Sequence, residues 1–275
     1  MNKTKNLKIL LEDVPISYYW LGFILADGSF FTQKGNVKRL NLSCSGKDHK
    51  HLLLYKDYIK SDNKCIIRDV KTNFGVFDVC SLTVSDNKII PMIEEKVGIV
   101  DELKTYLPPN LIVKDDVLFL CLLIGFIDGD GNISKQYKRI GSIISIQIHS
   151  TWLPLLNEML NRLYSITGTN PVLAKINKNG YCIARISNNI VLKYLKQQVI
   201  KYELPILKRK WEIIDMLYIS VQETSKQRII KTKGLLKEGL TYKEIAVILG
   251  IGLSGVYNMV KRNNLMENEY EYKGE

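Results

Sequence analysis

Two Asp-Gly pairs occupy equivalent places in two copies of one short pattern. The first copy reads WLGFILADG over residues 20–28, and the second reads LIGFIDGDG over residues 123–131. The offset between Asp27 and Asp130 (130 − 27 = 103 residues) is the length of a compact domain. Each aspartate ends an apolar run of helical length, where the helix dipole is negative. Carboxylates at such ends favour a bound hard cation, so the pattern predicts a metal site.

The two apolar helices are predicted to pack against each other. Gly22 and Gly125 fall in mid-helix, where each costs about 1 kcal/mol relative to alanine. Two such costs at matching positions indicate a close approach of two backbones across a pseudo-twofold axis. This packing would bring Asp27 and Asp130 together, and a divalent cation such as Mg²⁺ would relieve their repulsion.

The elements after each Asp-Gly pair are expected in one order: two strands, a helix, two strands and a helix. Each half therefore reads αββαββα, and the fold class is α+β. Ser17, and Asp115 or Asp116, are candidate N-caps for the two apolar helices. The halves are expected at 1–110 and 111–220, joined by the extended, proline-bearing segment 107–116.

The pattern changes after residue 220, where helical periodicity continues without strands. The segment TYKEIAVILG-IGLS-GVYNMVKR fits a helix-turn-helix, with the small Ala246 at the helix crossing and Gly250 at the turn. A plain helical hairpin docked on the body is the alternative, but the surrounding lysines favour nucleic acid. The small all-α module is expected at 221–265, followed by an acidic tail at 266–275.

The composition indicates a folded protein that binds a polyanion. The 275 residues carry a formal charge of +11, and 46% of them are hydrophobic, so a core can form beneath a basic surface. The apolar stretches are far shorter than the roughly 20 residues of a membrane span, and no membrane association is expected. Five scattered cysteines without a CxxC pair indicate a reducing, intracellular setting: bacterial or phage-infected cytoplasm, or an organelle matrix.

The two nonapeptides resemble the signature helices of the LAGLIDADG homing endonucleases, in the single-chain form with two motifs, here followed by a helix-turn-helix. The resemblance covers about residues 17–220. The eighth position of the family motif supplies a metal-binding acid, which implies Asp27 and Asp130, and Ala26 and Gly129 complete the implied metal-ligand set. The sixth position is Asp128 in the second copy but leucine in the first, a departure that we expect to leave catalysis intact.

The resemblance implies a duplicated saddle whose two antiparallel sheets lie in successive major grooves of double-stranded DNA. Two or three Mg²⁺ ions, replaceable by Mn²⁺, would support phosphodiester hydrolysis and a staggered double-strand break by a monomer. Arg185 lies at the end of the second hairpin of its half, where family members often have a basic residue near the active site. The resemblance therefore makes Arg185 a candidate for phosphate or transition-state stabilisation, whereas the first half has Thr83 there.

The polar residues of the expected strands and turns are candidate DNA contacts, because alternation directs polar side chains to one face of a sheet. We expect the exposed residues of the last helix to add contacts beyond the saddle. The candidates are Gln33, Lys34, Lys38, Arg39, Asn41, Arg68, Lys71, Lys135, Gln136, Lys138, Arg139, Gln147, Lys175 and Lys178 in the body, and Ser254, Tyr257, Asn258, Lys261 and Arg262 in the last helix.

Two other functions fit the same architecture. The first is a transcription regulator that joins a degenerate LAGLIDADG body to a helix-turn-helix; such a regulator is expected to lack the acids, whereas both are present here. The second is an RNA maturase that uses the same basic saddle on its own intron RNA, as an added activity. The sequence leaves the target DNA, the host and the maturase role open.

Overall fold

The computed structural model describes residues 6–72, 75–99, 108–136 and 141–265, and side chains are not described at 72 and 215–225. The chain divides into two compact units, Met1–Ile214 and Asp215–Glu275. The division falls within one continuous helix, six residues before the expected boundary at 220. In the described parts of the chain, no single helix is long and apolar enough to cross a membrane, although one bent helix pair near the C-terminus passes the same length and composition test.

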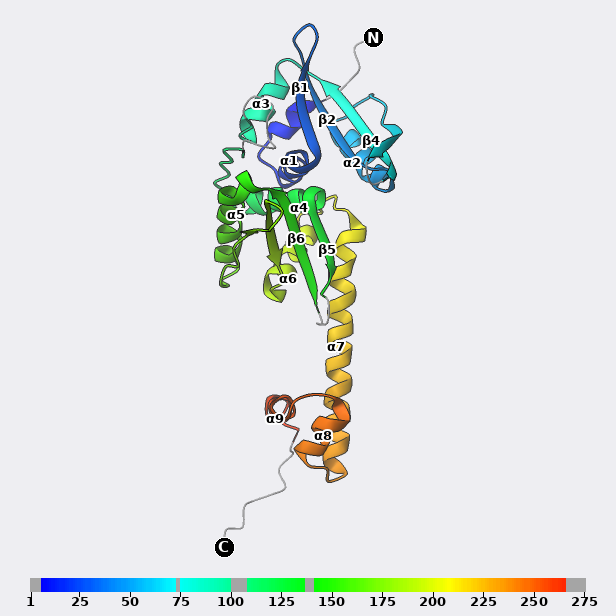
Figure 1. Ribbon diagram of the computed structural model, residues 1–275, viewed down its shortest axis with the longest axis vertical. Coiled ribbons are helices and arrows are strands. Elements are labelled where there is room, and N and C mark those ends of the chain that lie inside the picture. The colour runs from blue at the N-terminus through cyan, green and yellow to red at the C-terminus, as the bar shows by residue number, and fades with distance from the viewer. Residues whose placement is uncertain (1–5, 73–74, 100–107, 137–140, 266–275) are drawn as a thin grey trace. The chain divides into compact units, whose positions relative to one another are not determined.

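The first half of the larger unit forms one four-stranded antiparallel sheet with strand order β1-β2-β4-β3 (Figure 1). A short 3₁₀ helix, Leu7–Leu11, precedes it and another, Gly46–Asp48, follows β2. In chain order the elements are α1 (Pro15–Asp27), β1 (Gly28–Gln33), β2 (Val37–Ser45), α2 (His49–Tyr58), β3 (Ile66–Thr72), β4 (Gly75–Ser85) and α3 (Ile89–Lys96).

The second half repeats this order, with strand order β5-β6-β8-β7. The predicted α+β class and the αββαββα order of each half are confirmed. A 3₁₀ helix, Ser150–Trp152, precedes α5. The elements are α4 (Asp116–Asp130), β5 (Gly131–Lys135), β6 (Ser142–His149), α5 (Leu153–Ile166), β7 (Lys175–Ile176), β8 (Tyr181–Ile186) and α6 (Asn189–Lys201).

The two central helices begin differently from each other. The Asp115 side chain accepts a hydrogen bond from the backbone N–H of Leu118 at 2.9 Å and caps α4, as predicted. Helix α1 instead begins at Pro15, whose fixed φ suits a first helical turn. The expectation that Ser17 caps α1 is wrong, because Ser17 lies inside the helix, is buried and donates to the carbonyl of Ile9.

Alternation along the strands separates a covered face from an open face in each sheet. Leu40 and Leu42 of β2 are fully buried against the helices, and Ile144 and Ile146 of β6 occupy the equivalent places in the second sheet. Helices α1, α2 and α3 pack against the first sheet. Because side chains alternate, the residues between these buried positions belong to the open face.

The smaller unit has its own apolar core. Helix α7 (Lys208–Lys237) runs into it from the larger unit and is followed by α8 (Tyr242–Leu249) and α9 (Leu253–Arg262). The axes of α8 and α9 are bent by 106°. Ala246 is buried beside Val256 and Val260, and Gly250 takes a left-handed φ of 61° at the turn. The three helices form a small all-α module, as predicted.

Candidate functional site

Helices α1 and α4 contact each other backbone to backbone at the two mid-helix glycines. A Cβ on Gly22 would lie 1.9 Å from the carbonyl oxygen of Leu122, and a Cβ on Gly125 would lie 1.9 Å from that of Tyr19. The same 103-residue offset relates Gly22 to Gly125 and Tyr19 to Leu122, so the two contacts are reciprocal. The predicted close approach across a pseudo-twofold axis is therefore present.

The two predicted aspartates lie at adjoining helix ends. Asp27 is the half-buried last residue of α1, and Asp130 is the exposed last residue of α4. Between them, a Cβ on Gly129 would lie 2.2 Å from the Cβ of Ala26 and 3.4 Å from a carboxylate oxygen of Asp27. The four residues implied as metal ligands are thus gathered at one place.

This donor set suits Mg²⁺, which takes one or two carboxylates and fills its other positions with water and phosphate oxygens. Within the described ranges, no group of three or more His, Cys, Asp or Glu side chains comes together. Asp27 and Asp130 would therefore hold such an ion together with oxygens from elsewhere, as Mg²⁺ sites that use substrate phosphates do.

A buried carboxylate, Asp128, lies two residues before Asp130 on α4. Asp128 is 1% exposed, and its two oxygens accept hydrogen bonds from Tyr19 Oη (2.7 Å), the Leu207 N–H (3.0 Å) and Trp211 Nε1 (2.8 Å). Burial raises the pKa of Asp128, and these three donors oppose that rise. Asp128 therefore joins α1, α4 and the start of α7, a role that the sequence did not indicate.

The ammonium of Lys210 lies against the same helix end. Lys210 Nζ donates to the carbonyl oxygens of Asp128 (2.5 Å) and Gly131 (2.6 Å) and lies 3.4 Å from that of Gly129. Burial lowers the pKa of Lys210, while the charges of Asp128 and Asp27 work in the opposite direction. A cation here offsets the negative end of α4 beside the paired aspartates. Sequence reasoning missed Lys210, because its site becomes visible only when α7 is placed against α4.

The start of α7 is also tied to the first half. The Arg209 guanidinium forms a bidentate pair with Asp48, with distances of 2.7 and 2.5 Å. Burial disfavours the charged Asp48, but its hydrogen bonds and ion pair with Arg209 outweigh burial and lower its pKa. His51, at 4% exposure, lies 3.0 Å from Tyr19 Oη, and burial lowers its pKa to about 4. His51 is thus a core residue.

The open face of the first sheet carries four of the predicted DNA contacts. Ser29 pairs with Asn41, Phe31 with Arg39, and Arg68 with Val79, all on the face away from the helices. Gln33 lies at the exposed end of this face. The Arg39 Nε is buried and has no hydrogen-bond partner in the described part of the chain.

The open face of the second sheet carries Gln147, Lys175 and Arg185, each of them exposed. Arg185 pairs with Ser145 as Thr83 pairs with Asn41, so Arg185 and Thr83 occupy equivalent positions in the two sheets. In the first sheet Thr83 donates to Asn41 Oδ1 at 2.9 Å.

Three predicted contacts lie on the other face, so the expectation of a common face is wrong for them. The register places Lys38, Lys71 and Lys135 on the same sides as the buried apolar residues. Lys38 forms an ion pair with Glu94 of α3 at 3.9 Å. The prediction failed because a turn or bend can change which alternate residues of the next strand face the helices. Composition alone does not reveal such a change.

The remaining candidates lie outside the strands or outside the described residues. Lys34 and Lys178 are exposed in turns, whereas the side-chain amide of Gln136 donates to the carbonyl of Ser142 at 2.9 Å. Lys138 and Arg139 fall outside the described residues. On α9, five candidates are all exposed on one surface, opposite Val256 and Val260: Ser254, Tyr257, Asn258, Lys261 and Arg262.

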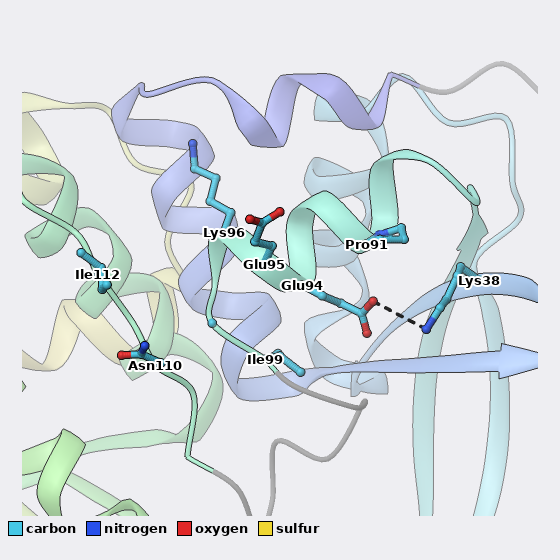
Figure 2. A pocket seen from close by; sticks show the side chains of 9 residues that line it. Lys38, Pro91, Glu94, Glu95, Lys96, Ile99, Asn110 and Ile112 are labelled. Carbon is cyan, nitrogen blue, oxygen red and sulfur yellow. Dashed lines mark ion pairs between the residues drawn. The ribbon is translucent and has the colours of Figure 1, made fainter.

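A surface hollow of about 700 Å³ lies beside α3, where Lys38 and Glu94 approach each other and Asn110 and Ile112 line the opposite side (Figure 2). It contains neither Asp27 nor Asp130. We assign this hollow no role.

Comparisons with known proteins agree with this geometry. No protein-family model and no curated protein matches the chain. Among solved structures, the homing endonuclease I-WcaI bound to its DNA recognition sequence aligns with a TM-score of 0.51 and 19% identity, over 73% of this chain and 87% of its own.

Two structures of a second protein align similarly. The I-SmaMI LAGLIDADG homing endonuclease bound to cleaved DNA has a TM-score of 0.50 and 16% identity, over 85% of this chain and 95% of its own. I-SmaMI bound to an uncleaved target with calcium ions has a TM-score of 0.50 and 15% identity, over 76% and 92%. The larger unit of this chain has the fold of the LAGLIDADG homing endonucleases.

Proposed function

We propose that the chain is a site-specific homing endonuclease that makes a staggered double-strand break in a long, asymmetric DNA site. The observation that carries the proposal is the pair of aspartates, Asp27 and Asp130, at adjoining helix ends next to two basic open sheet faces. The solved structures with this fold include homing endonucleases bound to DNA. A regulator built on the same fold would have no need of both acids.

In this mechanism the chain's residues would hold the cations and position the scissile phosphates. Asp27 and Asp130 would hold divalent cations, with the backbone carbonyls of Ala26 and Gly129 as further candidate ligands. When bound, such cations supply Lewis-acid stabilisation of the leaving oxygen and a more acidic attacking water. Arg185, exposed at the open face, is in a position suited to a phosphate contact.

The open faces would read the target. Their side chains differ between the two sheets at nearly every equivalent position, which suits an asymmetric sequence. Gln and Asn pair with adenine, and Arg with guanine, in the major groove. Arg39 lies on the open face of the first sheet, which suits a contact with guanine.

The smaller unit would add affinity outside the saddle. In a helix-turn-helix the second helix enters the major groove, which assigns that role to α9 and its exposed Tyr257 and Lys261. Binding of the chain's own intron RNA would be a separate, added activity on the same basic surface.

The test is cleavage of a randomised duplex library with Mg²⁺ or Mn²⁺. We expect Asp27→Asn and Asp130→Asn each to reduce cleavage on the order of 10²–10³-fold, the usual effect of removing one group that stabilises transition-state charge. Asp57→Asn, an exposed aspartate on α2, is the matched control and should cut normally. The proposal fails if both centre variants cut like the wild type, or if the wild type cuts no member of the library.

A further inference from the structure

The β3–β4 hairpin exposes apolar side chains on the same face as the predicted DNA contacts. Ile66 is 60% exposed and Phe77 is 49% exposed. Phe77 pairs with Val70, and Arg68 lies between Ile66 and Val70 on the same strand and face. Because large apolar residues on a sheet face are ordinarily buried, this group around Arg68 points to an occupant that offers apolar surface as well as negative charge.

The reverse face of the hairpin is equally apolar, but its two aspartates outweigh the single Lys71 and give it a net negative charge. Ile67 is 55% exposed and Val76 is 62% exposed. Between them, Asp69 lies directly opposite Asp78, and its hydrogen bond and charge raise the pKa of Asp78. Two adjacent carboxylates repel a phosphate backbone, whereas Arg68 attracts one. Charge complementarity therefore directs a polyanion to the open face.

We propose that Ile66 and Phe77 are specificity-determining residues that contact the C5-methyl groups of thymines in the major groove. This inference rests on the proposed function, since it assumes that duplex DNA lies on the open faces. The thymine methyl is the apolar feature that the four bases display in the major groove, and apolar side chains recognise it.

The register also sets the spacing of the two thymines. Phe77 lies opposite Val70, four residues along β3 from Ile66, which is about 13 Å at roughly 3.3 Å per residue. Base pairs rise about 3.4 Å per step, so the contacted thymines should be about four base pairs apart in one half of the site.

The experiment replaces thymine by uracil, which removes only the methyl group. A duplex bound by the full-length protein is first selected from a randomised library, and Mg²⁺-dependent cleavage of that duplex checks the proposed function. The duplex is then made with thymine throughout, with uracil throughout, and with uracil at single positions. Dissociation constants are measured for the wild type and for two double variants. The open-face variant combines Ile66→Ala with Phe77→Ala. The reverse-face control, its matched counterpart, combines Ile67→Ala with Val76→Ala.

We expect the wild type to bind the uracil duplex roughly 15-fold more weakly, about fourfold for each methyl lost. The loss should be confined to two positions about four base pairs apart. The open-face variant should bind the thymine and uracil duplexes equally. The reverse-face control should keep the wild-type ratio of the two dissociation constants. Thermal melting of both variants checks that they are folded.

Two outcomes would overturn the inference. One is a wild type that binds and cuts the selected duplex but does not distinguish thymine from uracil. The other is a reverse-face control that, like the open-face variant, no longer distinguishes the thymine duplex from the uracil duplex. In both cases the nuclease proposal stands, whereas absence of cleavage in the first step counts against the nuclease proposal itself.

Discussion

The reciprocal glycine contacts make a strong prediction about Gly125→Ala. The new Cβ would lie 1.9 Å from the Tyr19 carbonyl oxygen, so the helices must separate by about 1.5 Å to reach an ordinary 3.4 Å contact. Because the obstructing atom is backbone, the strain should be near the upper end of overpacking, about 3 kcal/mol, less the roughly 1 kcal/mol that alanine gains over glycine in a helix. The net loss of about 2 kcal/mol corresponds to about 4–8 °C in Tm for a unit of this size.

Thermal unfolding followed by circular dichroism measures the effect, and cleavage rates measure its consequence at the aspartates. A displacement of about 1 Å at a catalytic centre can cost about 10²-fold in rate, so activity should fall further than the stability loss explains. The matched control is Gly234→Ala in α7, where a Cβ meets open space and should stabilise by up to about 1 kcal/mol. A Gly125→Ala protein as stable and active as the wild type would refute the close-packed interface.

Three further predictions concern other parts of the chain. Burial lowers the pKa of His51 to about 4, so between that pH and its ordinary pKa of about 6.5 the imidazole takes up a proton when the protein unfolds. The unfolding free energy should therefore fall by about 3 kcal/mol as the pH drops from 6.5 to about 4. Urea titrations should give His51→Gln a flatter pH dependence than His49→Gln, and equal slopes would contradict this. Asp128→Asn removes the carboxylate that accepts three hydrogen bonds and whose charge lies near the buried Lys210. Calorimetry should therefore show an unfolding free energy lower by about 3–5 kcal/mol. Melting like that of the wild type would exclude a stabilising network around Asp128. Lys261→Ala and Arg262→Ala should each weaken DNA binding and reduce by about one the slope of the logarithm of the binding constant against the logarithm of the salt concentration. Unchanged binding would show that α9 does not contact the DNA.

The architecture could be predicted because local signals repeat. Two apolar helices with matched glycines and two equivalent runs of alternating residues define the αββαββα order without knowledge of any distant contact. The glycines also predicted the helix pairing, since a glycine in mid-helix has an energetic cost that a close backbone contact explains. Asp27 and Asp130 followed from the repeated Asp-Gly pairs, whereas Ala26 and Gly129 were added only by the resemblance to the LAGLIDADG family.

The rest of the site depends on contacts between distant segments. Asp128 and Lys210 are 82 residues apart, and nothing in the local sequence of either indicates the other. The face of Lys38 was mispredicted for a related reason, since strand phase beyond a turn is set by pairing with a neighbour. Ser17 likewise looked like a cap because the 3₁₀ segment that supplies its partner, Ile9, has no helical periodicity of its own.

The hydrogen bond from Tyr19 to Asp128 restricts how the two halves could have been assembled. The positions related to these residues by the repeat are Leu122 and Leu25, both buried, so the interface is polar on one side of the pseudo-axis and apolar on the other. A homodimer of second halves would set each Asp128 opposite a leucine, with a buried carboxylate deprived of its tyrosine donor. After gene duplication and fusion, this divergence would have committed each half to its partner, and exchange of halves between relatives should succeed only when both members of the pair move together.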